Sequence, residues 1–304
     1  MIKWMRTYNL NCERGEECQF FGYDIKPIEE ACRTLRYVTK NVSNEIYKRT
    51  DIILKEIEDI PLADRTNYGE ILSDKDTLWL LGWLTGHELE ICEKVGQPMY
   101  ELAIISCRMI YQYLDGMLTS YHRTGEMGKR DQYMAENINY LISRMPRDTK
   151  IIVWAHNAHI SVDESWKNLG WWLRHWYGDL YYTFGLTYTR GTFQARYYKN
   201  DEIGPLSEFD AGEPLEDFWE YDLQQIRKGN YFMDLREIKA KGDSAREWAC
   251  SQIKRIRAIG SGFNPDNPFP DDCIYDSYVL GDMYDGIFHI EKTSRARPTP
   301  TGMR

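Results

Sequence analysis

The chain has 304 residues, of which 42% are hydrophobic and 28% charged, as is typical of a soluble globular protein with one large domain or two ordinary ones. Its formal net charge of −9 argues against nucleic-acid binding, and no apolar run approaches the roughly 18 residues of a membrane-spanning helix. The N-terminus lacks the long apolar segment of a signal peptide. Seven cysteines without C-x-x-C spacing predict free thiols in the cytoplasm and no zinc site.

The first half of the sequence is predicted to be mainly helical. We expect a short helix at residues 2–8, then a buried strand at residues 18–25 that places the carboxylate of Asp24 at its C-terminal end. Longer helical segments follow at residues 27–58, with a break near residues 41–43, and at 73–95, 98–122 and 126–144.

The second half alternates between strands and helices. Residues 150–154 form a continuous apolar run, which predicts a strand buried on both faces of a parallel sheet. Residues 180–188 and 191–198 predict a hairpin joined at Thr189 and Arg190. The remaining predictions are helix 164–177, a surface connection at 201–217, helix 215–228, strand 230–235, helix 243–258 and strand 285–290.

This order favours an α/β fold with a mainly parallel sheet flanked by helices, a large helical insertion and a C-terminal β-hairpin. We expect one domain over residues 1–304, with the insertion at about 27–125 and the α/β part at about 126–292. Residues 293–304 are expected to be a mobile tail.

Two histidines follow the apolar run directly, in the sequence IIVWAHNAHI at residues 151–160. Ligands of α/β sheets bind beyond the C-terminal ends of strands, so His156 and His159 are candidate catalytic residues. Each could instead form structural hydrogen bonds, or the pair could bind a metal with further ligands.

A helical face at residues 126–144 adds polar candidates. Arg130 and Asn137 share an apolar stripe, and Asp131 lies beside it. Arg130 and Asp131 could line the cleft of the histidines, or they could form a structural pair. Asn137 could bind substrate or a neighbouring loop. Asp24 could likewise bind substrate or cap a helix.

Aromatic residues are abundant, with 22 Tyr and 10 Trp. Most such residues pack in cores, but Trp171, near Trp172 and Trp176, could line a cleft for a bulky substrate. The sequence has no Walker motif, no G-x-G-x-x-G and no G-x-S-x-G, which disfavours kinases, nicotinamide enzymes and α/β-hydrolases.

Four segments together resemble the erythromycin esterase family: WMRTYN (4–9), FFGYDI (20–25), RDQYMAEN (130–137) and WAHNAHI (154–160). Residues 169–195 and 284–298 extend the resemblance over nearly the whole chain. Members of this family are often labelled succinoglycan biosynthesis proteins. The resemblance implies a metal-independent hydrolase, without a cofactor, that opens a macrolactone ester by activating water.

The resemblance also assigns residues to this activity. His156 and His159 match the family's second histidine motif, whereas its principal base belongs to a G-E-x-x-H-G motif that precedes W-x-R-x-Y-N. No G-E-x-x-H-G sequence occurs here, which predicts either a truncated chain or a natural protein without the main base. The expected partner is a small-molecule substrate, with no membrane; the oligomeric state stays open.

Two alternatives are kept beside the esterase hypothesis. The chain could be an inactive binding module that retains the cleft for macrolides or glycans. It could also be a metal-dependent enzyme that uses His156, His159 and Asp24. Fold-level analogy alone does not decide among these functions.

Overall fold

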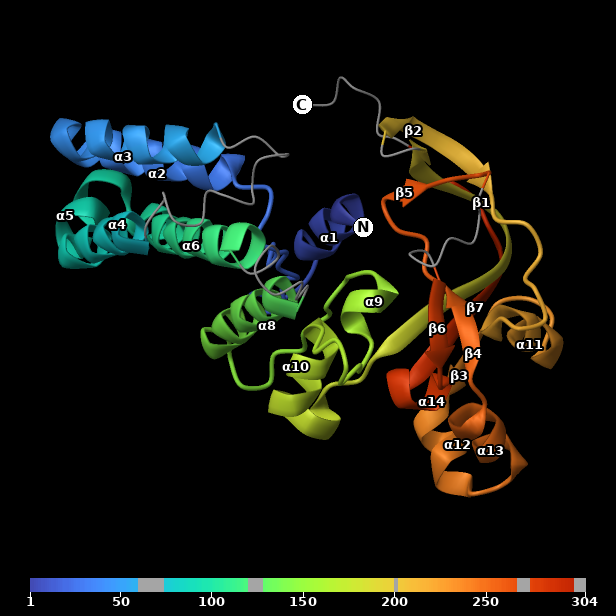
Figure 1. The fold of residues 1–304 in the computed structure, drawn as a ribbon. Helices are drawn as coiled ribbons and strands as arrows, with labels where there is room; N and C mark the ends of the chain where they lie inside the picture. The colour runs from blue at the N-terminus through green and yellow to red at the C-terminus, as the bar shows by residue number, and fades with distance from the viewer. Residues whose placement is uncertain (60–73, 120–127, 200–201, 267–273, 298–304) are drawn as a thin grey trace. The chain divides into compact units, whose positions relative to one another are not determined.

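The computed structural model describes residues 1–59, 74–119, 128–199, 202–266 and 274–297 (Figure 1). The chain divides into two compact units, one of residues 1–125 with 136–146 and one of residues 126–135 with 147–304. Within the described ranges, no helix is both long and apolar enough to span a membrane.

The first unit is helical. Its elements are α1 (Ile2–Asn9), α2 (Glu29–Val42), α3 (Asn44–Glu58), α4 (Asp74–Gly86), α5 (Glu88–Val95), α6 (Gln97–Tyr113), a π-helical turn (Leu114–Thr119) and the second half of α8 (Gly128–Ser143). The predicted break in the long helix is confirmed, because Ser43 adopts extended dihedral angles and its hydroxyl accepts the Ile46 N–H. The predicted cap at residue 73 and the predicted helix end at residue 122 lie outside the described residues.

One apolar core holds the helical unit together. Leu35 and Val38 of α2, Leu54 of α3 and Ile91 of α5 are fully buried in it, and Ile110 of α6 is 1% exposed. Burial of side chains of this size contributes roughly 1.5–3 kcal/mol each. The helices of the first unit therefore share a hydrophobic core.

The second unit is the α/β part. It contains the first half of α8, the helices α9 (Asn157–Ile160), α10 (Leu169–Tyr177), α11 (Trp219–Ile226), α12 (Leu235–Lys241), α13 (Ser244–Ser251) and α14 (Leu280–Met283), and a 3₁₀ turn (Gly178–Leu180). Its strands are β1 (Phe184–Lys199), β2 (Glu202–Asp210), β3 (Tyr231–Asp234), β4 (Lys254–Arg257), β5 (Gly262–Phe263), β6 (Ile274–Tyr278) and β7 (Gly286–Thr293).

The main sheet has the strand order β2-β1-β7-β3, with β5 paired to β1, and β4 pairs separately with β6. The β1–β7 and β1–β5 pairs are parallel, whereas β1–β2, β3–β7 and β4–β6 are antiparallel. The predicted α/β class is confirmed, but the sheet is mixed and not mainly parallel. One core of the unit gathers Trp219 and Leu223 of α11, Leu235 of α12 and Ile287 of β7.

Two predicted strands do not form. Residues 150–154 and 18–23 have no regular secondary structure, and Ile152 and Trp154 are 91% and 73% exposed. At Leu186 of β1, the side chain of Asn157 bonds both the backbone N–H and the backbone C=O, at 3.0 and 2.7 Å. An apolar run becomes a strand only beside a free strand edge, and here the amide of Asn157 occupies that position on Leu186.

The segment around residues 18–25 shows the same pattern inside the helical unit. The side chain of Asn9 bonds both the N–H and the C=O of Cys18, each at 2.8 Å. Phe20 and Phe21 remain 64% and 43% exposed. The predicted strand is replaced by a loop, and at its start a side-chain amide makes the backbone bonds that a neighbouring strand would make.

Other boundaries also differ from the predictions. The two strands expected at 180–188 and 191–198 are one strand, β1, and the hairpin lies between β1 and β2. Most of the connection expected at 201–217 is therefore a strand, β2. The helix expected at 243–258 ends at Ser251, and β4 follows. Strands β3 and β7 match the predicted positions.

Candidate active site

The HNAH sequence forms a short helical turn that begins at His156. His156 is the N-cap of α9, and its Nδ1 accepts a hydrogen bond from the N–H of Ala158 at 3.2 Å. Its Nε2 therefore carries the ring hydrogen and donates it to the carbonyl of Ile259 at 3.1 Å. Both ring nitrogens thus hold the turn in place.

The charge state of His156 follows from its surroundings. The residue is exposed, but neighbouring protein atoms desolvate the ring and lower its pKa, and the nearby His159 lowers the pKa further. The bond to Ile259 opposes this shift only in part. A neutral His156 is consistent with its acceptor bond to Ala158.

His159, one turn later, has a different environment. Its Nδ1 lies 2.8 and 2.9 Å from the two carboxylate oxygens of Asp131, which comes from the first half of α8. A carboxylate only accepts hydrogen bonds, so Nδ1 carries the hydrogen and the Nε2 of a neutral ring keeps its lone pair. Asp131 is 6% exposed and the His159 side chain 27%, which leaves the ring accessible from outside.

Asp131 has a second, independent partner. Its Oδ2 accepts the backbone N–H of Leu169 at 2.9 Å, at the start of α10. The first N–H groups of a helix have no partner within the helix, and the helix dipole favours a negative charge at this end. The carboxylate that orients His159 is therefore fixed by both a side chain and a helix N-terminus.

The start of α10 is fastened to the HNAH turn by Asn168. Its Oδ1 accepts the N–H of Trp171 at 3.0 Å, while its Nδ2 donates to the Ala158 carbonyl and the Ser161 hydroxyl at 2.7 and 2.8 Å. Gly170 permits the close approach, since a Cβ there would lie 2.2 Å from the carbonyl oxygens of Ile160 and Ser161.

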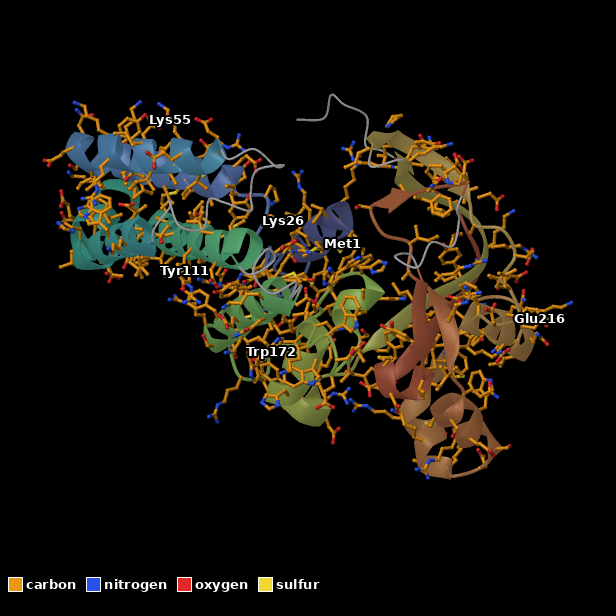
Figure 2. All side chains as sticks on the ribbon, viewed as in Figure 1. Met1, Lys26, Lys55, Tyr111, Trp172 and Glu216 are labelled. Carbon is orange, nitrogen blue, oxygen red and sulfur yellow. The ribbon has the colours of Figure 1, made fainter. Side chains whose placement is uncertain are left out.

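The other predicted site residues are less closely associated with this pair. Arg130 is half-buried on α8, adjacent in sequence to Asp131. Trp171 is half-buried on α10, stacks on His175 at 5.2 Å between ring centroids, and meets Trp172 edge-on at 4.9 Å. Trp172, labelled in Figure 2, also packs against Trp176 of the same helix at 5.5 Å between ring centroids.

Asn137 and Asp24 belong to the helical unit. The amide of Asn137 exchanges hydrogen bonds with the side chain of Gln112, both at 2.9 Å, and donates to the carbonyl of Tyr23 at 3.0 Å. Asp24 accepts the N–H of Ile25 at 2.8 Å. The bonds of Asn137 join α6 and α8 to the loop at Tyr23.

Sequence reasoning missed three residues that shape the site, namely Asn157, Asn168 and Gly170. Asn168 could have been found, because Asn before a helical segment is a common N-cap. The positions of Asn157 and Gly170 depend on long-range packing and carry no local signal. Among the described residues, no three His, Cys, Asp or Glu side chains are arranged to hold a metal ion.

A mixed α/β unit with a histidine oriented by a buried carboxylate is an arrangement that hydrolytic enzymes use for general-base chemistry. The sequence matches the Erythromycin esterase family over residues 1–293, so the chain belongs to that family of hydrolases. The similarity thus covers both units of the structure.

Individual relatives agree with this assignment. An erythromycin esterase type II from Escherichia coli is 29% identical, over 96% of this chain and 71% of the relative. A succinoglycan biosynthesis protein of known structure has a TM-score of 0.73 at 20% identity, over 96% of this chain and 69% of its own. The erythromycin esterase EreC, as a mutant in its open conformation, has a TM-score of 0.61 at 16% identity, over 99% of this chain and 74% of its own.

Proposed function

We propose that this chain hydrolyses an ester bond, and that the His159–Asp131 pair moves the proton of the attacking water. The observation that carries the proposal is the bond from His159 Nδ1 to the buried Asp131 carboxylate, which leaves Nε2 as a base. The family membership supports ester hydrolysis as the reaction. Asp131 orients His159 and does not itself contact the reacting atoms.

The proposed reaction needs one base and one water molecule. Nε2 of His159 removes a proton from water as the water oxygen attacks the ester carbonyl carbon. The imidazolium that forms is stabilised by Asp131. The tetrahedral intermediate then expels the alcohol oxygen, which takes the proton from the His159 imidazolium and so restores the neutral base. The products are a carboxylic acid and an alcohol. Arg130, next to Asp131, is proposed to help fix this geometry.

We propose a macrolactone as the substrate class, with His156 shaping the turn that carries His159 and Trp171 as a candidate contact. The support is the family assignment and the activity named for the Escherichia coli relative. A half-exposed Trp171, packed against Trp172, offers an apolar surface to a large ring.

The strength of the proposed activity is a separate point. No G-E-x-x-H-G sequence occurs among the 304 residues, and the family resemblance makes that motif the principal base. We propose that, within these 304 residues, the His159–Asp131 pair supports weak hydrolysis. Added imidazole should then raise the rate above the sum of two rates, that of the protein without imidazole and that of imidazole without the protein, since it supplies a second base.

The direct test replaces His159 by Gln and follows ring opening of erythromycin by the mass gain of one water. The kcat of His159→Gln should fall on the order of 10²–10⁴-fold, the usual contribution of a general base. His87→Gln is the matched control, because His87 is exposed in the helical unit and its Nδ1 lies 2.9 Å from the Trp83 carbonyl oxygen. Wild-type kcat in His159→Gln would contradict the proposal.

The binding-module alternative predicts a different result from the same experiment. Erythromycin would then bind with a measurable Kd and quench Trp fluorescence, while its mass stayed unchanged with and without imidazole. The metal-dependent alternative is disfavoured by geometry, since both ring nitrogens of His156 are already in hydrogen bonds.

A further inference from the structure

The carbonyl group of Ile160 accepts hydrogen bonds from two hydroxyl groups. Ile160 is the last residue of α9 and follows His159 directly. Its carbonyl oxygen accepts the hydroxyl of Tyr181 at 2.7 Å and that of Thr183 at 2.8 Å. The last carbonyls of a helix have no partner within the helix, and each carbonyl oxygen has two lone pairs. The two hydroxyls therefore fix the C-terminal end of the HNAH turn.

Thr183, the first of these donors, has a rigid position. It is 2% exposed and lies directly before β1. Its N–H donates to Oδ2 of Asp285 at 2.9 Å, and its carbonyl accepts the N–H groups of Asp285 and Gly286 at 3.0 and 3.1 Å. Since both backbone groups of Thr183 are bonded to the start of β7, its hydroxyl is held in one place.

Tyr181, the second donor, is supported by the same ion-pair cluster. Its carbonyl accepts a hydrogen bond from Nη2 of Arg236 at 2.7 Å, and its ring centroid lies 5.8 Å from the Arg174 guanidinium. Both arginines pair with Asp285. Tyr181 itself is half-buried, so water can partly replace its hydroxyl. The cluster around Asp285 thus orients both hydroxyl donors.

The position of Ile160 is coupled to that of His159 through the turn. The N–H groups of both residues donate to the carbonyl of His156, at 2.9 Å from His159 and 3.2 Å from Ile160. A displaced Ile160 carbonyl would therefore move the His159 ring relative to Asp131. Hydrogen bonds weaken steeply as their angle departs from linearity, and the bond at Nδ1 decides which ring nitrogen carries the hydrogen.

We propose that Thr183 and Tyr181 are positioning residues for His159. Their hydroxyls hold the Ile160 carbonyl, which keeps the Nδ1 hydrogen of His159 on Asp131 and leaves Nε2 as the base. The inference rests on the proposed function, because it names the groups that orient the proposed base. Neither hydroxyl contacts the reacting atoms. Without them the ring can carry its hydrogen on Nε2, where it cannot accept a proton from water.

The test replaces the buried hydroxyl by a methyl group in Thr183→Val. NMR of the histidine ring nitrogens in the full chain, at about pH 8 where an ordinary histidine is neutral, reports the tautomer. The signals of His159 are assigned by their loss in His159→Gln. The wild type should show the Nδ1–H tautomer, and Thr183→Val a mixture with Nε2–H.

The kinetic readout is the ring opening of erythromycin. The kcat of Thr183→Val should fall about tenfold to 10²-fold with KM unchanged, since a misplaced catalytic group lowers the rate without removing a substrate contact. Thr183→Ser keeps the hydroxyl and should restore both kcat and the Nδ1–H tautomer. Tyr181→Phe, at a half-buried position that tolerates substitution better, should change both in the same direction but less.

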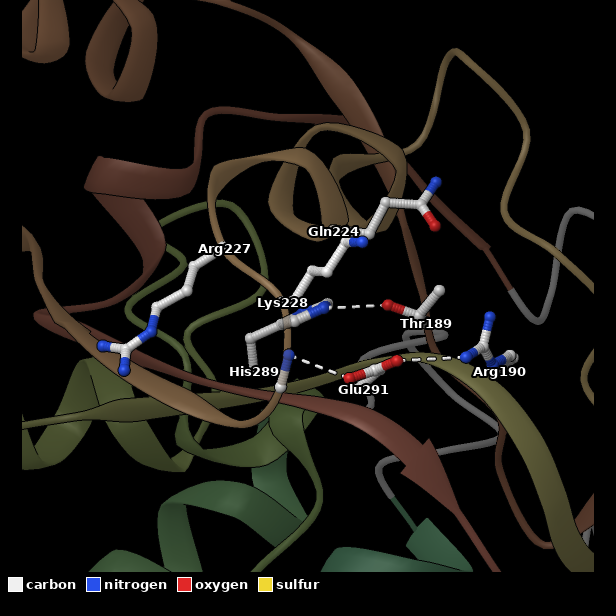
Figure 3. A pocket seen from close by; sticks show the side chains of 8 residues that line it. Thr189, Arg190, Gln224, Arg227, Lys228, His289 and Glu291 are labelled. Atoms are coloured by element: carbon white, nitrogen blue, oxygen red, sulfur yellow. Dashed lines mark hydrogen bonds and ion pairs between the residues drawn. The ribbon is translucent and has the colours of Figure 1, made fainter.

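Thr189→Val is the matched control. Thr189 of β1 is 3% exposed, and its hydroxyl lies 2.9 Å from Nε2 of His289, in a cavity that shares no residue with the HNAH turn (Figure 3). This variant should lower the unfolding midpoint as Thr183→Val does, but it should leave the tautomer of His159 and kcat unchanged.

The two proposals fail in different ways. A wild-type tautomer in both Thr183→Val and Tyr181→Phe, or an equal tautomer change in Thr189→Val, would overturn the positioning role. Absence of ring opening by the wild type would refute the esterase proposal. The NMR measurement decides the positioning role in either case, because it needs no turnover.

Discussion

Two carboxylates of the α/β unit, Asp285 and Glu220, are almost equally buried but have opposite surroundings. Asp285, at the start of β7, is 2% exposed and pairs with both Arg174 and Arg236. Glu220, on α11, is 1% exposed; Oε1 accepts the N–H of Arg257 at 3.1 Å, and no partner of Oε2 exists in the described part of the chain.

The partners decide the charge of each group. Burial alone would raise the pKa of Asp285, but hydrogen bonds from Arg236 and the N–H of Thr183 outweigh it and hold that pKa below its usual value. Burial raises the pKa of Glu220 to about 7, and the bond from Arg257 opposes this only in part. At nearly equal burial, the charged form of Asp285 is stabilised by its partners, whereas the charged form of Glu220 is destabilised.

The largest expected effect comes from removing the better-paired carboxylate. Asp285→Ala should lower the free energy of unfolding by about 3 kcal/mol, because two arginines lose their shared partner. The lowered pKa of Asp285 stabilises the folded state at pH values above about 4, the pKa of an aspartate in the unfolded chain. This stabilisation is lost as the pH falls through the pKa of Asp285 in the folded state. Urea unfolding should show that the gap between wild type and variant narrows below pH 4.

Asp282→Ala is the control for this prediction, since Asp282 is exposed on the neighbouring α14. It should leave the free energy of unfolding within about 0.5 kcal/mol of the wild type. A gap between wild type and Asp285→Ala that stayed constant from pH 7 to pH 3 would show that the ion pairs are not its cause.

Glu220→Gln tests the opposite case. The unfolded chain loses this proton near pH 4.3 and the folded chain near pH 7, so wild-type stability should fall as pH rises between these values. The variant lacks this loss and should be more stable at pH 8 by up to about 3 kcal/mol. Exposed Glu216→Gln is the control, and parallel pH curves for Glu220→Gln and wild type would refute the prediction.

The sequence predicts helices of this fold better than strands, for a physical reason. A helix closes its own hydrogen bonds, so the capping side chain of Ser43 and the apolar periodicity suffice to place α2 and α3. A strand needs a neighbour. Residues 150–154 are apolar enough for a strand, but the Asn157 amide takes the bonds of Leu186, which no local pattern reveals.

The candidate active site also combines features that the sequence predicts with features that it does not. His159 and Asp131 were both candidates from the sequence, and the structure brings them within 2.8 Å. The different hydrogen-bond partners of His156 and His159 could not be predicted. The carbonyl of Ile259, which accepts the bond from His156 Nε2, lies 103 residues away in the sequence. Sequence motifs thus supply candidate groups, and long-range hydrogen bonds indicate which nitrogen is available.

The smallest expected effect concerns two neutral groups of the same unit, the hydroxyls of Tyr188 and Tyr231. The hydroxyl of Tyr188 is buried and has no partner among the described residues, whereas that of Tyr231 donates to the Leu223 carbonyl at 2.7 Å. Tyr188→Phe should be neutral or stabilise the fold by up to about 1 kcal/mol, and Tyr231→Phe should cost about 1 kcal/mol. Thermal unfolding of both variants compares them directly; equal losses would mean that a partner, such as an internal water molecule, satisfies the Tyr188 hydroxyl.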